Sequence, residues 1–320
     1  MGITIGICVR NGAKYIMETL RALEGQTVRP DQVLVINDHS TDSTKNILKI
    51  FQSATKLGFS FHDINGKGLF DGRNHVLSLA KNEIVAFTDA DCVPSSDWVE
   101  QIMRVFKEHP DVVGGTGSHP GLEEKNFVSK LHKWWFIVEG VKEAGYTQGV
   151  IGANCYFRKS ALEEVGGWIH LEVGNAEDVY IAHKLTERGM KLWHDPRVQV
   201  AHHYATEWPD FLRKTYRSGY AITLMMREVG IRTFLYYYTM IIPVVALWLL
   251  AGVFALAAGK FQIGLALISS VLALTFLFNL RMFRTVSNTL PRWFTRWIII
   301  WGYSAGILAG FMKRIKRHNE

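Results

Sequence analysis

A short apolar segment that ends in two carboxylates constrains the fold of this chain more than any other feature. Residues 84–87 read Ile-Val-Ala-Phe, and Asp89 and Asp91 follow them, one residue apart. In an extended chain, alternate side chains lie on the same side. Two carboxylates at the end of a buried strand are suited to bind a hard divalent cation and, through it, a diphosphate. A solvated loop with two aspartates is the alternative, because the short pattern alone is weakly specific.

The first part of the chain alternates between apolar runs and segments with helical spacing. We expect strands at residues 3–9, 32–36, 59–61, 84–87 and 112–115. This alternation predicts a mostly parallel sheet that helices cover on both faces. Ligands of such sheets bind at the carboxyl ends of the strands. Asn11, Asp38 and the Asp89–Asp91 segment all follow strands, so three strand ends indicate one site.

The helices between and after these strands have recognisable starts. Ser40 or Thr41 can cap the helix that runs through residue 51, and Asp42 is expected to act as a cap as well. Further helices are predicted at residues 73–81, 97–107, 127–138, 177–188 and 210–221, and further strands at 150–157 and 198–200. Glu177 and Asp178 open one of these helices. Favourable charges in a first turn are one explanation for this acidic pair.

The composition changes to membrane-like from about residue 234. The runs 239–259 and 261–280 each have about the ~20 apolar residues that a spanning helix needs, and they are close enough to form a tight hairpin. A third, shorter apolar run at 294–312 is either a third span or an interfacial helix. The sequence therefore predicts a catalytic domain at 1–230 and a membrane domain at 231–320.

The charge distribution points to a bilayer. The net charge of +7 lies within residues 281–320, which hold eight Lys or Arg and one Glu. These charges flank apolar segments, which favours a surface of anionic lipids over nucleic acid. The three cysteines are widely spaced, as in a reducing compartment, and no signal peptide is visible. We expect a multi-pass protein of the cell membrane or an internal membrane, with its catalytic domain in the cytosol.

Six motifs within residues 3–220 resemble those of family-2 inverting glycosyltransferases, which have the α/β GT-A fold with a Rossmann-like sheet. In order they are Asn11, the segment 37–42, Gly68 with Arg73-Asn74, Asp89-Ala90-Asp91, Gly152-Ala153-Asn154, and Glu177-Asp178. Cys8 stands where the family usually has proline, and Asn37 replaces an aspartate. The Q-x-x-R-W motif of processive synthases is absent, which argues against processive synthesis.

The resemblance implies a metal-dependent, inverting hexosyltransferase that uses a UDP- or GDP-linked sugar. Mg²⁺ or Mn²⁺ would lie on Asp91, assisted by Asp89, with His202 either a further ligand or a structural residue. Asp178, with Glu177 beside it, is the candidate base. The residues expected to bind the nucleotide-sugar are Asn11, Asp38, Arg73, Asp89 and Asp91.

The acceptor is expected to be lipid-linked, because a membrane anchor keeps an enzyme at the bilayer. On the acceptor side the resemblance places Gly152, Asn154, Trp168 and Arg217, although Arg217 fits a solvated helix face equally well. A hydroxyl of a lipid-linked glycan is favoured because it needs a base, whereas polyprenyl or dolichyl phosphate does not. A non-catalytic sugar-nucleotide-binding membrane scaffold is the alternative of another class. The sequence leaves a homo-oligomer open.

Overall fold

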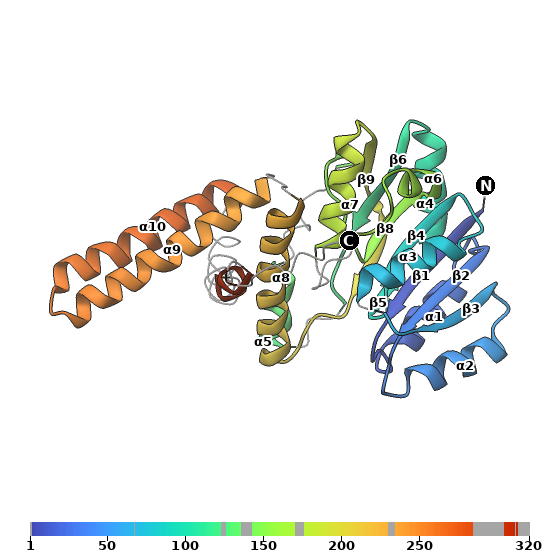
Figure 1. Cartoon of the computed structure of the whole chain (residues 1–320), viewed down its shortest axis with the longest axis horizontal. Helices are drawn as coiled ribbons and strands as arrows, with labels where there is room; N and C mark the ends of the chain where they lie inside the picture. The colour runs from blue at the N-terminus through green and yellow to red at the C-terminus, as the bar shows by residue number, and fades with distance from the viewer. Residues whose placement is uncertain are drawn as a thin grey trace, which may run out of the picture. The chain divides into compact units, whose positions relative to one another are not determined.

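The computed structural model describes residues 2–66, 68–122, 126–135, 143–169, 176–229, 234–283, 304–310 and 312. The chain divides into two compact units. The first consists of Met1–Glu123 and Val138–Tyr204, and the second of Glu124–Ile137 and Ala205–Glu320. Figure 1 labels the helices and strands of both units.

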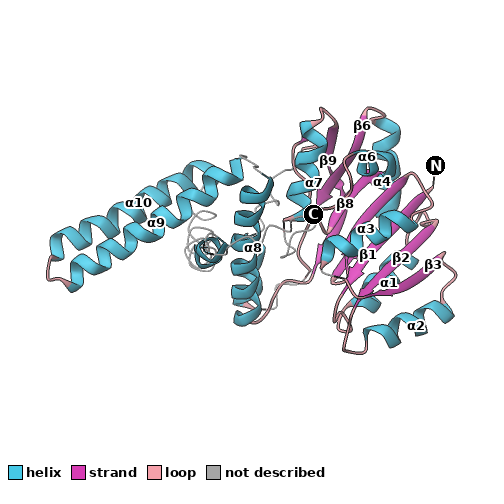
Figure 2. Cartoon of the chain, in the orientation of Figure 1, coloured by secondary structure: helices cyan, strands magenta, loops and turns pink. Residues whose placement is uncertain are grey.

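A mixed β-sheet forms the centre of the first unit (Figure 2). Its described strands are β1 Ile3–Val9, β2 Gln32–Asp38, β3 Phe59–Ile64, β4 Ile84–Asp89, β5 Cys92–Pro94, β6 Val112–Ser118, β7 Gly145–Thr147, β8 Asn154–Arg158 and β9 Lys191–His202. They lie in the order β3-β2-β1-β4-β8-β6-β9-β5, and β7 pairs with β9. The pairs among β1 to β4 are parallel, whereas β8 runs antiparallel to both β4 and β6. The sheet is therefore mixed: parallel pairing holds for β1 to β4 and for β6 with β9, whereas the pairs of β8, β5 and β7 are antiparallel.

Helices cover both faces of this sheet, as the alternation predicts. One face packs against α1 (Ile16–Glu24), α2 (Thr44–Ala54) and α4 (Trp98–Glu108), and the other against α3 (Leu69–Leu79), α6 (Lys159–Glu164) and α7 (Glu177–Glu187). Strand β2 shows the cause. Val33 and Val35 belong to the first apolar core and Leu34 and Ile36 to the second, because successive side chains of a strand point to opposite faces.

The carboxyl ends of three neighbouring strands place the polar segments next to one another. In the parallel register Cys8 of β1 lies opposite Asp89 of β4, and Val9 lies opposite Asn37 of β2. The chain therefore leaves β1, β2 and β4 at one edge of the sheet. This edge carries Asn11, Asp38 and Asp89, as predicted.

The start of α2 differs from the prediction. The helix begins at Thr44 with Ser43 at its N-cap, so neither Ser40 nor Thr41 caps it. Both residues bind Asn11 instead: the Asn11 amide donates to Ser40 Oγ at 2.9 Å, and the Thr41 amide donates to Asn11 Oδ1 at 2.8 Å. The loop after β2 therefore binds the loop after β1, and the helix starts later.

Three other boundaries also differ because of pairing or turns. Strand β8 begins at Asn154 rather than at 150, after the turn at Gly152 and Ala153. Strand β9 covers Lys191–His202 instead of 198–200, since most of it pairs with β6. Helix α3 begins at Leu69, four residues before Arg73.

The second unit is helical. Its described helices are α5 Phe127–Trp135, α8 Trp208–Val229, α9 Phe234–Ala257, α10 Phe261–Phe283 and a segment at 304–310. Aromatic contacts join α5 to α8, between Phe127 and Trp208 and between His132 and Phe211. The second unit includes α8, and the division into a catalytic and a membrane domain at residue 230 stays a prediction.

Helices α9 and α10 form the predicted hairpin. Gly259, with φ of 75°, lies in the turn between them, and a Cβ on Gly264 would lie 2.8 Å from the Gly252 carbonyl oxygen. Within the described residues, however, no helix combines the length and hydropathy needed to cross a membrane. The spans predicted at 239–259 and 261–280 are therefore not supported. Of the third predicted helix at 294–312, residues 294–303 and 311 lie outside the described residues.

Candidate active site

A buried arginine connects three of the predicted site segments. The Arg73 side chain is 2% exposed, and its Nη1 lies 3.3 Å from Glu177 Oε1. Its Nη2 donates to the Gly152 carbonyl at 2.9 Å and lies 3.8 Å from Asp89 Oδ1. Arg73 thus joins the end of β4, the turn before β8 and the start of α7.

Aromatic rings enclose the same guanidinium. Arg73 lies 4.5 Å from the ring centre of Trp168 and 5.7 Å from that of Phe87. Asn74 fixes the Trp168 backbone, since its side-chain amide donates to the Trp168 carbonyl at 2.7 Å and its oxygen accepts from the Trp168 amide at 2.8 Å. Burial opposes the charge of Arg73, but Glu177 and other neighbouring acidic groups raise its pKa above the ordinary value, so Arg73 stays cationic.

Asp178 has the features of a general base. It is partly exposed in the first turn of α7. Its Oδ2 accepts a hydrogen bond from the Gly152 amide at 3.1 Å, and its Oδ1 accepts one from the Val179 amide at 2.8 Å. Burial, and next the charge of Glu177, raise the pKa of Asp178 to about 6, although Arg73 opposes the shift. At neutral pH such a carboxylate is ionised and can accept a proton.

Gly152 can be only glycine without rearrangement of this cluster. A Cβ there would lie 2.9 Å from Arg73 Nη2 and 3.4 Å from Asp178 Oδ2. The absence of a side chain lets the Gly152 amide reach Asp178 while its carbonyl reaches Arg73. The predicted role of Gly152 on the acceptor side is therefore accompanied by a positioning role for the base.

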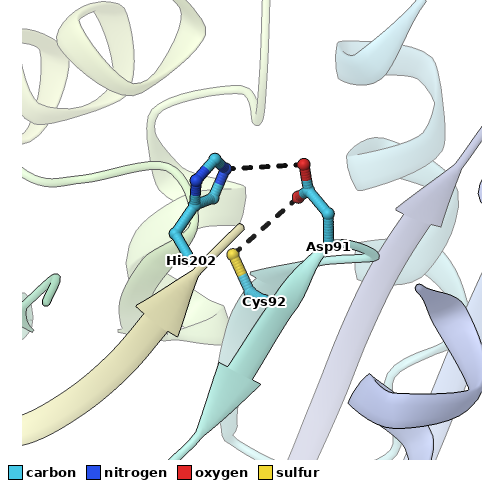
Figure 3. A group of neighbouring side chains, drawn as sticks. All are labelled: Asp91, Cys92 and His202. Atoms are coloured by element: carbon cyan, nitrogen blue, oxygen red, sulfur yellow. Dashed lines mark hydrogen bonds and ion pairs between the residues drawn. The ribbon is translucent and has the colours of Figure 1, made fainter. Parts of the chain in front are cut away.

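A second group lies where β5 meets the end of β9. Figure 3 shows the His202 ring and the Asp91 carboxylate facing each other, with His202 Nε2 3.5 Å from Asp91 Oδ2. Their side chains are 7% and 35% exposed, so the group opens on the Asp91 side. A carboxylate oxygen and an imidazole nitrogen are suitable ligands for a divalent cation. The donors present therefore fit the predicted metal.

The two aspartates of the D-x-D motif have different surroundings. Strand β4 ends at Asp89, and Ala90 and Asp91 form a turn, so the alternation assumed from the sequence stops there. Asp89 approaches Arg73, whereas Asp91 approaches His202. Among the described residues, Asp89 is not part of the group of ligand atoms around Asp91. The structure brings Asp91 together with His202, and a cation held by both carboxylates stays a prediction.

The nucleotide-side residues hold the loops at the strand ends. Asp38 is buried, and its Oδ1 accepts from the Gly66 amide at 2.9 Å. Asn11 is exposed, with φ of 56°, and its side chain binds the Thr41 amide. Asp42 accepts from the amides of Ala13 and Thr44, which joins the same two loops. Binding of a nucleotide by Asn11, Asp38 and Arg73 stays a prediction.

Two predicted acceptor-side residues serve the interior instead. Asn154 has no exposed surface; its oxygen accepts from Trp98 Nε1, and its amide donates to the carbonyls of Ser118 and Val198. The Trp168 side chain is 2% exposed and packs against Arg73. Both side chains are buried in this structure, and their roles on the acceptor side stay predictions. Arg217 is exposed on α8 in the second unit, and its role stays a prediction.

Several residues near the site were not predicted. His203 donates its amide to the Asp91 carbonyl at 3.1 Å, places Nε2 2.7 Å from Glu18 Oε2 and stacks on Tyr15. Asn74 holds Trp168, as described above. The only sequence signal for Asn74 is its position beside Arg73 in the motif. No local pattern distinguishes His203 from His202.

Comparison with known proteins identifies the family of the chain. The family model described as "Glycosyl transferase family 2" matches residues 4–166, about half of the 320-residue chain. Glycosyltransferase AglE of Haloferax volcanii is 26% identical over 261 residues, 78% of this chain and 80% of that protein. The glucosyl-dolichyl phosphate glucuronosyltransferase of the same organism is 22% identical, over 70% of this chain and 77% of that protein.

Two solved structures are similar in fold. The mannosyltransferase PcManGT from Pyrobaculum calidifontis, in complex with GDP-Man and Mn²⁺, has a TM-score of 0.69 at 19% identity and covers 98% of this chain and 88% of its own. S. aureus TarS 1–349 with UDP-GlcNAc has a TM-score of 0.52 at 16% identity and covers 99% and 93%. At these identities the likeness shows a common GT-A-like fold.

Proposed function

Since the chain belongs to glycosyl transferase family 2, we propose that this glycosyltransferase moves a sugar from a nucleotide-diphosphate donor to a hydroxyl of a lipid-linked glycan, with inversion. One observation carries the choice of a hydroxyl acceptor. Asp178 is partly exposed and has a pKa raised to about 6, which suits a group that removes a proton from a hydroxyl near neutral pH.

The donor belongs at the strand ends of the sheet. Asn11 and Asp38 lie there to bind the nucleotide, and Asp91 with His202 would hold Mg²⁺ or Mn²⁺. Such a cation would neutralise charge on the departing nucleoside diphosphate. Support comes from the similar folds that are complexed with GDP-Man and Mn²⁺ and with UDP-GlcNAc.

The acceptor is activated by the cluster at the start of α7. Asp178 takes the hydroxyl proton while the acceptor oxygen forms a bond to the anomeric carbon, and the bond from that carbon to the diphosphate oxygen breaks. Attack from the face opposite the leaving group inverts the anomeric centre. Arg73 keeps Glu177 paired, and the Gly152 amide orients the Asp178 carboxylate.

The lipid-linked nature of the acceptor rests on two supports. One relative is named as a glucosyl-dolichyl phosphate glucuronosyltransferase. In addition, α9 and α10 expose many large apolar side chains, among them Leu247 at 65%, Phe254 at 75% and Phe261 at 65%. We propose that this hairpin attaches the protein to a bilayer with anionic lipids, to which the basic residues within 281–317 would contribute, and that the catalytic unit faces the cytosol.

The test uses the purified full chain with a panel of UDP- and GDP-sugars, Mn²⁺, and either a lipid-linked saccharide or polyprenyl phosphate. We expect transfer to the saccharide, inverted stereochemistry by NMR, and a loss of about 10²–10⁴ in kcat for Asp178→Asn. Transfer to polyprenyl phosphate that survives Asp178→Asn would replace the proposed acceptor with the phosphate. No transfer from any donor would refute the proposal.

A further inference from the structure

The residue after the D-x-D motif lies beside the metal candidates and has not been assigned a role. Strand β5 runs antiparallel to the end of β9, and Cys92 is the register partner of His202. Directly opposed residues on neighbouring strands have their side chains on the same face, about 4.5–5.5 Å apart at Cβ. The His203 amide extends this pairing by donating to the Asp91 carbonyl at 3.1 Å. Backbone pairing therefore fixes Asp91, Cys92 and His202 relative to one another.

The three donor atoms lie near one another. Cys92 Sγ lies 3.9 Å from Asp91 Oδ1, His202 Nε2 lies 3.5 Å from Asp91 Oδ2, and one ligand atom from each residue lies within 4.8 Å of the others (Figure 3). In a tetrahedral zinc site, bonds of about 2.0–2.3 Å separate neighbouring ligand atoms by about 3.3–3.8 Å. The three donors are gathered but are farther apart than bound ligands, so the side chains would have to move inward to hold one cation.

We propose that Cys92 is the third protein ligand of the cation, together with Asp91 and His202. The proposal deepens the proposed function, because this cation is the one that would meet the nucleoside diphosphate. A fourth position is left on the exposed side of Asp91 for a phosphate oxygen. Ligation converts the thiol to a thiolate and releases its proton.

This donor set changes which metals the site accepts. Mg²⁺ favours six oxygen ligands, whereas sulfur and nitrogen donors favour Zn²⁺ and Co²⁺. Mn²⁺, which prefers oxygen donors, is expected to bind more weakly, and Mg²⁺ more weakly still. The enzyme should therefore rank divalent metals differently from one with an all-oxygen site.

A neighbouring histidine lies within reach of the Cys92 sulfur. His119 Nε2 lies 3.9 Å from Cys92 Sγ, and the His119 and His202 rings are 5.0 Å apart. An imidazole N–H can donate to the sulfur once the thiol has lost its proton. Cys92 itself belongs to the apolar core.

Cobalt spectroscopy tests the proposal directly. Full-length protein, stripped of metal by a chelator, is titrated with Co²⁺, because a cobalt–thiolate bond gives a charge-transfer band in the near ultraviolet. We expect the band in the wild type, its loss in Cys92→Ala, and a drop in Zn²⁺ affinity of about tenfold or more in that variant. Cys155→Ala is the matched control, since Cys155 is also fully buried in the core, and it should keep the band.

The other outcomes overturn the proposal and are distinguishable from failure of the proposed function. Co²⁺ binding without the band in the wild type, or a band that persists in Cys92→Ala, removes Cys92 from the ligands while transfer activity stands. If circular dichroism shows that Cys92→Ala does not fold, Cys92→Ser replaces it. A band that is present in the wild type and absent in Cys92→Ser then supports the proposal, and a band that persists in Cys92→Ser overturns it. If the protein shows the thiolate band but transfers no sugar, the proposed glycosyltransferase function is refuted and the proposed metal site is supported.

Discussion

At the residue scale, the site depends on the different electrostatic environments of two adjacent carboxylates. Glu177 and Asp178 are adjacent in sequence, but Glu177 is paired with the buried Arg73, whereas Asp178 is held by backbone amides and keeps a raised pKa. Glu177 faces a cation, whereas partial burial makes Asp178 a proton acceptor. Two neighbouring acidic groups therefore have different tasks.

The raised pKa of Asp178 makes stability depend on pH. Its pKa of about 6 lies above the ordinary value of 3.8, so its stabilising contribution is complete below pH 3.8 and is lost as the pH rises through about 6. At pH 8 the free energy of unfolding of Asp178→Asn should therefore exceed that of wild type by about 1–2 kcal/mol, and the variant should melt at a higher temperature. Near pH 4 the two proteins should not differ. Calorimetry across this range measures it.

The exposed Glu187 on the same helix provides the control. Glu187→Gln should show no change in the pH dependence of melting. A difference between Asp178→Asn and wild type that stayed constant from pH 4 to pH 8 would contradict a raised pKa. The rate of transfer in wild type should also increase as the pH rises through about 6, because the ionised carboxylate is the active form.

Removal of the Arg73 charge should be costly. Arg73→Met leaves the buried Glu177 without its cationic partner, and we expect a loss of about 3–5 kcal/mol in the free energy of unfolding. Arg104→Met breaks the exposed pair with Glu108 and should cost less than about 1 kcal/mol. Urea unfolding of both variants gives the comparison. Equal losses in the two variants would show that the buried pair contributes no more to the free energy of unfolding than the exposed pair.

At the element scale, turns decide which residues of the site meet. The turn at Ala90 and Asp91 sends Asp89 toward Arg73 and Asp91 toward His202. The turn before β8 brings the Gly152 amide to Asp178 and its carbonyl to Arg73. Strands supply the approximate position, and the turns after and before them select the partner.

A methyl group at Gly152 should disturb the base. Gly152→Ala places a Cβ 2.9 Å from Arg73 Nη2, and we expect a loss of about 1–3 kcal/mol in stability together with reduced transfer. Gly145→Ala is the control, because a Cβ there meets nothing within 4 Å. Thermal melting and kcat measure the two effects. Full activity in Gly152→Ala would mean that Asp178 does not need the Gly152 amide.

At the scale of the whole molecule, the two units have different surfaces. The first unit buries its apolar side chains in two cores, one on each face of the sheet. In the second unit, α9 and α10 leave large apolar side chains exposed, including Leu247 and Phe254. Such a surface is typical of a protein or lipid contact.

The proposed bilayer attachment is tested by flotation with liposomes that contain anionic lipid. We expect the wild type to float with the vesicles. Leu247→Ser with Phe254→Ser should weaken binding roughly tenfold or more, since each lost side chain removes about 1.5–3 kcal/mol of apolar burial. Ile50→Ser removes an equally exposed apolar residue from α2 and should leave binding unchanged. Equal flotation of all three proteins would refute attachment through the hairpin.

The sequence by itself determined the alternation of strands and helices from β1 to β4, the edge at which polar residues gather, and the resemblance to the family. These features are local. Apolar alternation defines β1, β2 and β4, and the residues that leave parallel neighbouring strands must emerge at one edge. Asp178 at the start of α7 could be selected in the same way, from a motif and a helix start.

Only the tertiary structure decided which of these residues touch. Arg73 meets the Gly152 carbonyl across 79 positions of sequence, and Cys92 meets His202 through antiparallel pairing of β5 with β9. The burial of Trp168 and Asn154 and the place of α8 in the second unit were likewise not predictable. Burial, pKa and ligand geometry arise from contacts between distant segments, and a local pattern contains no information on which segments pack together.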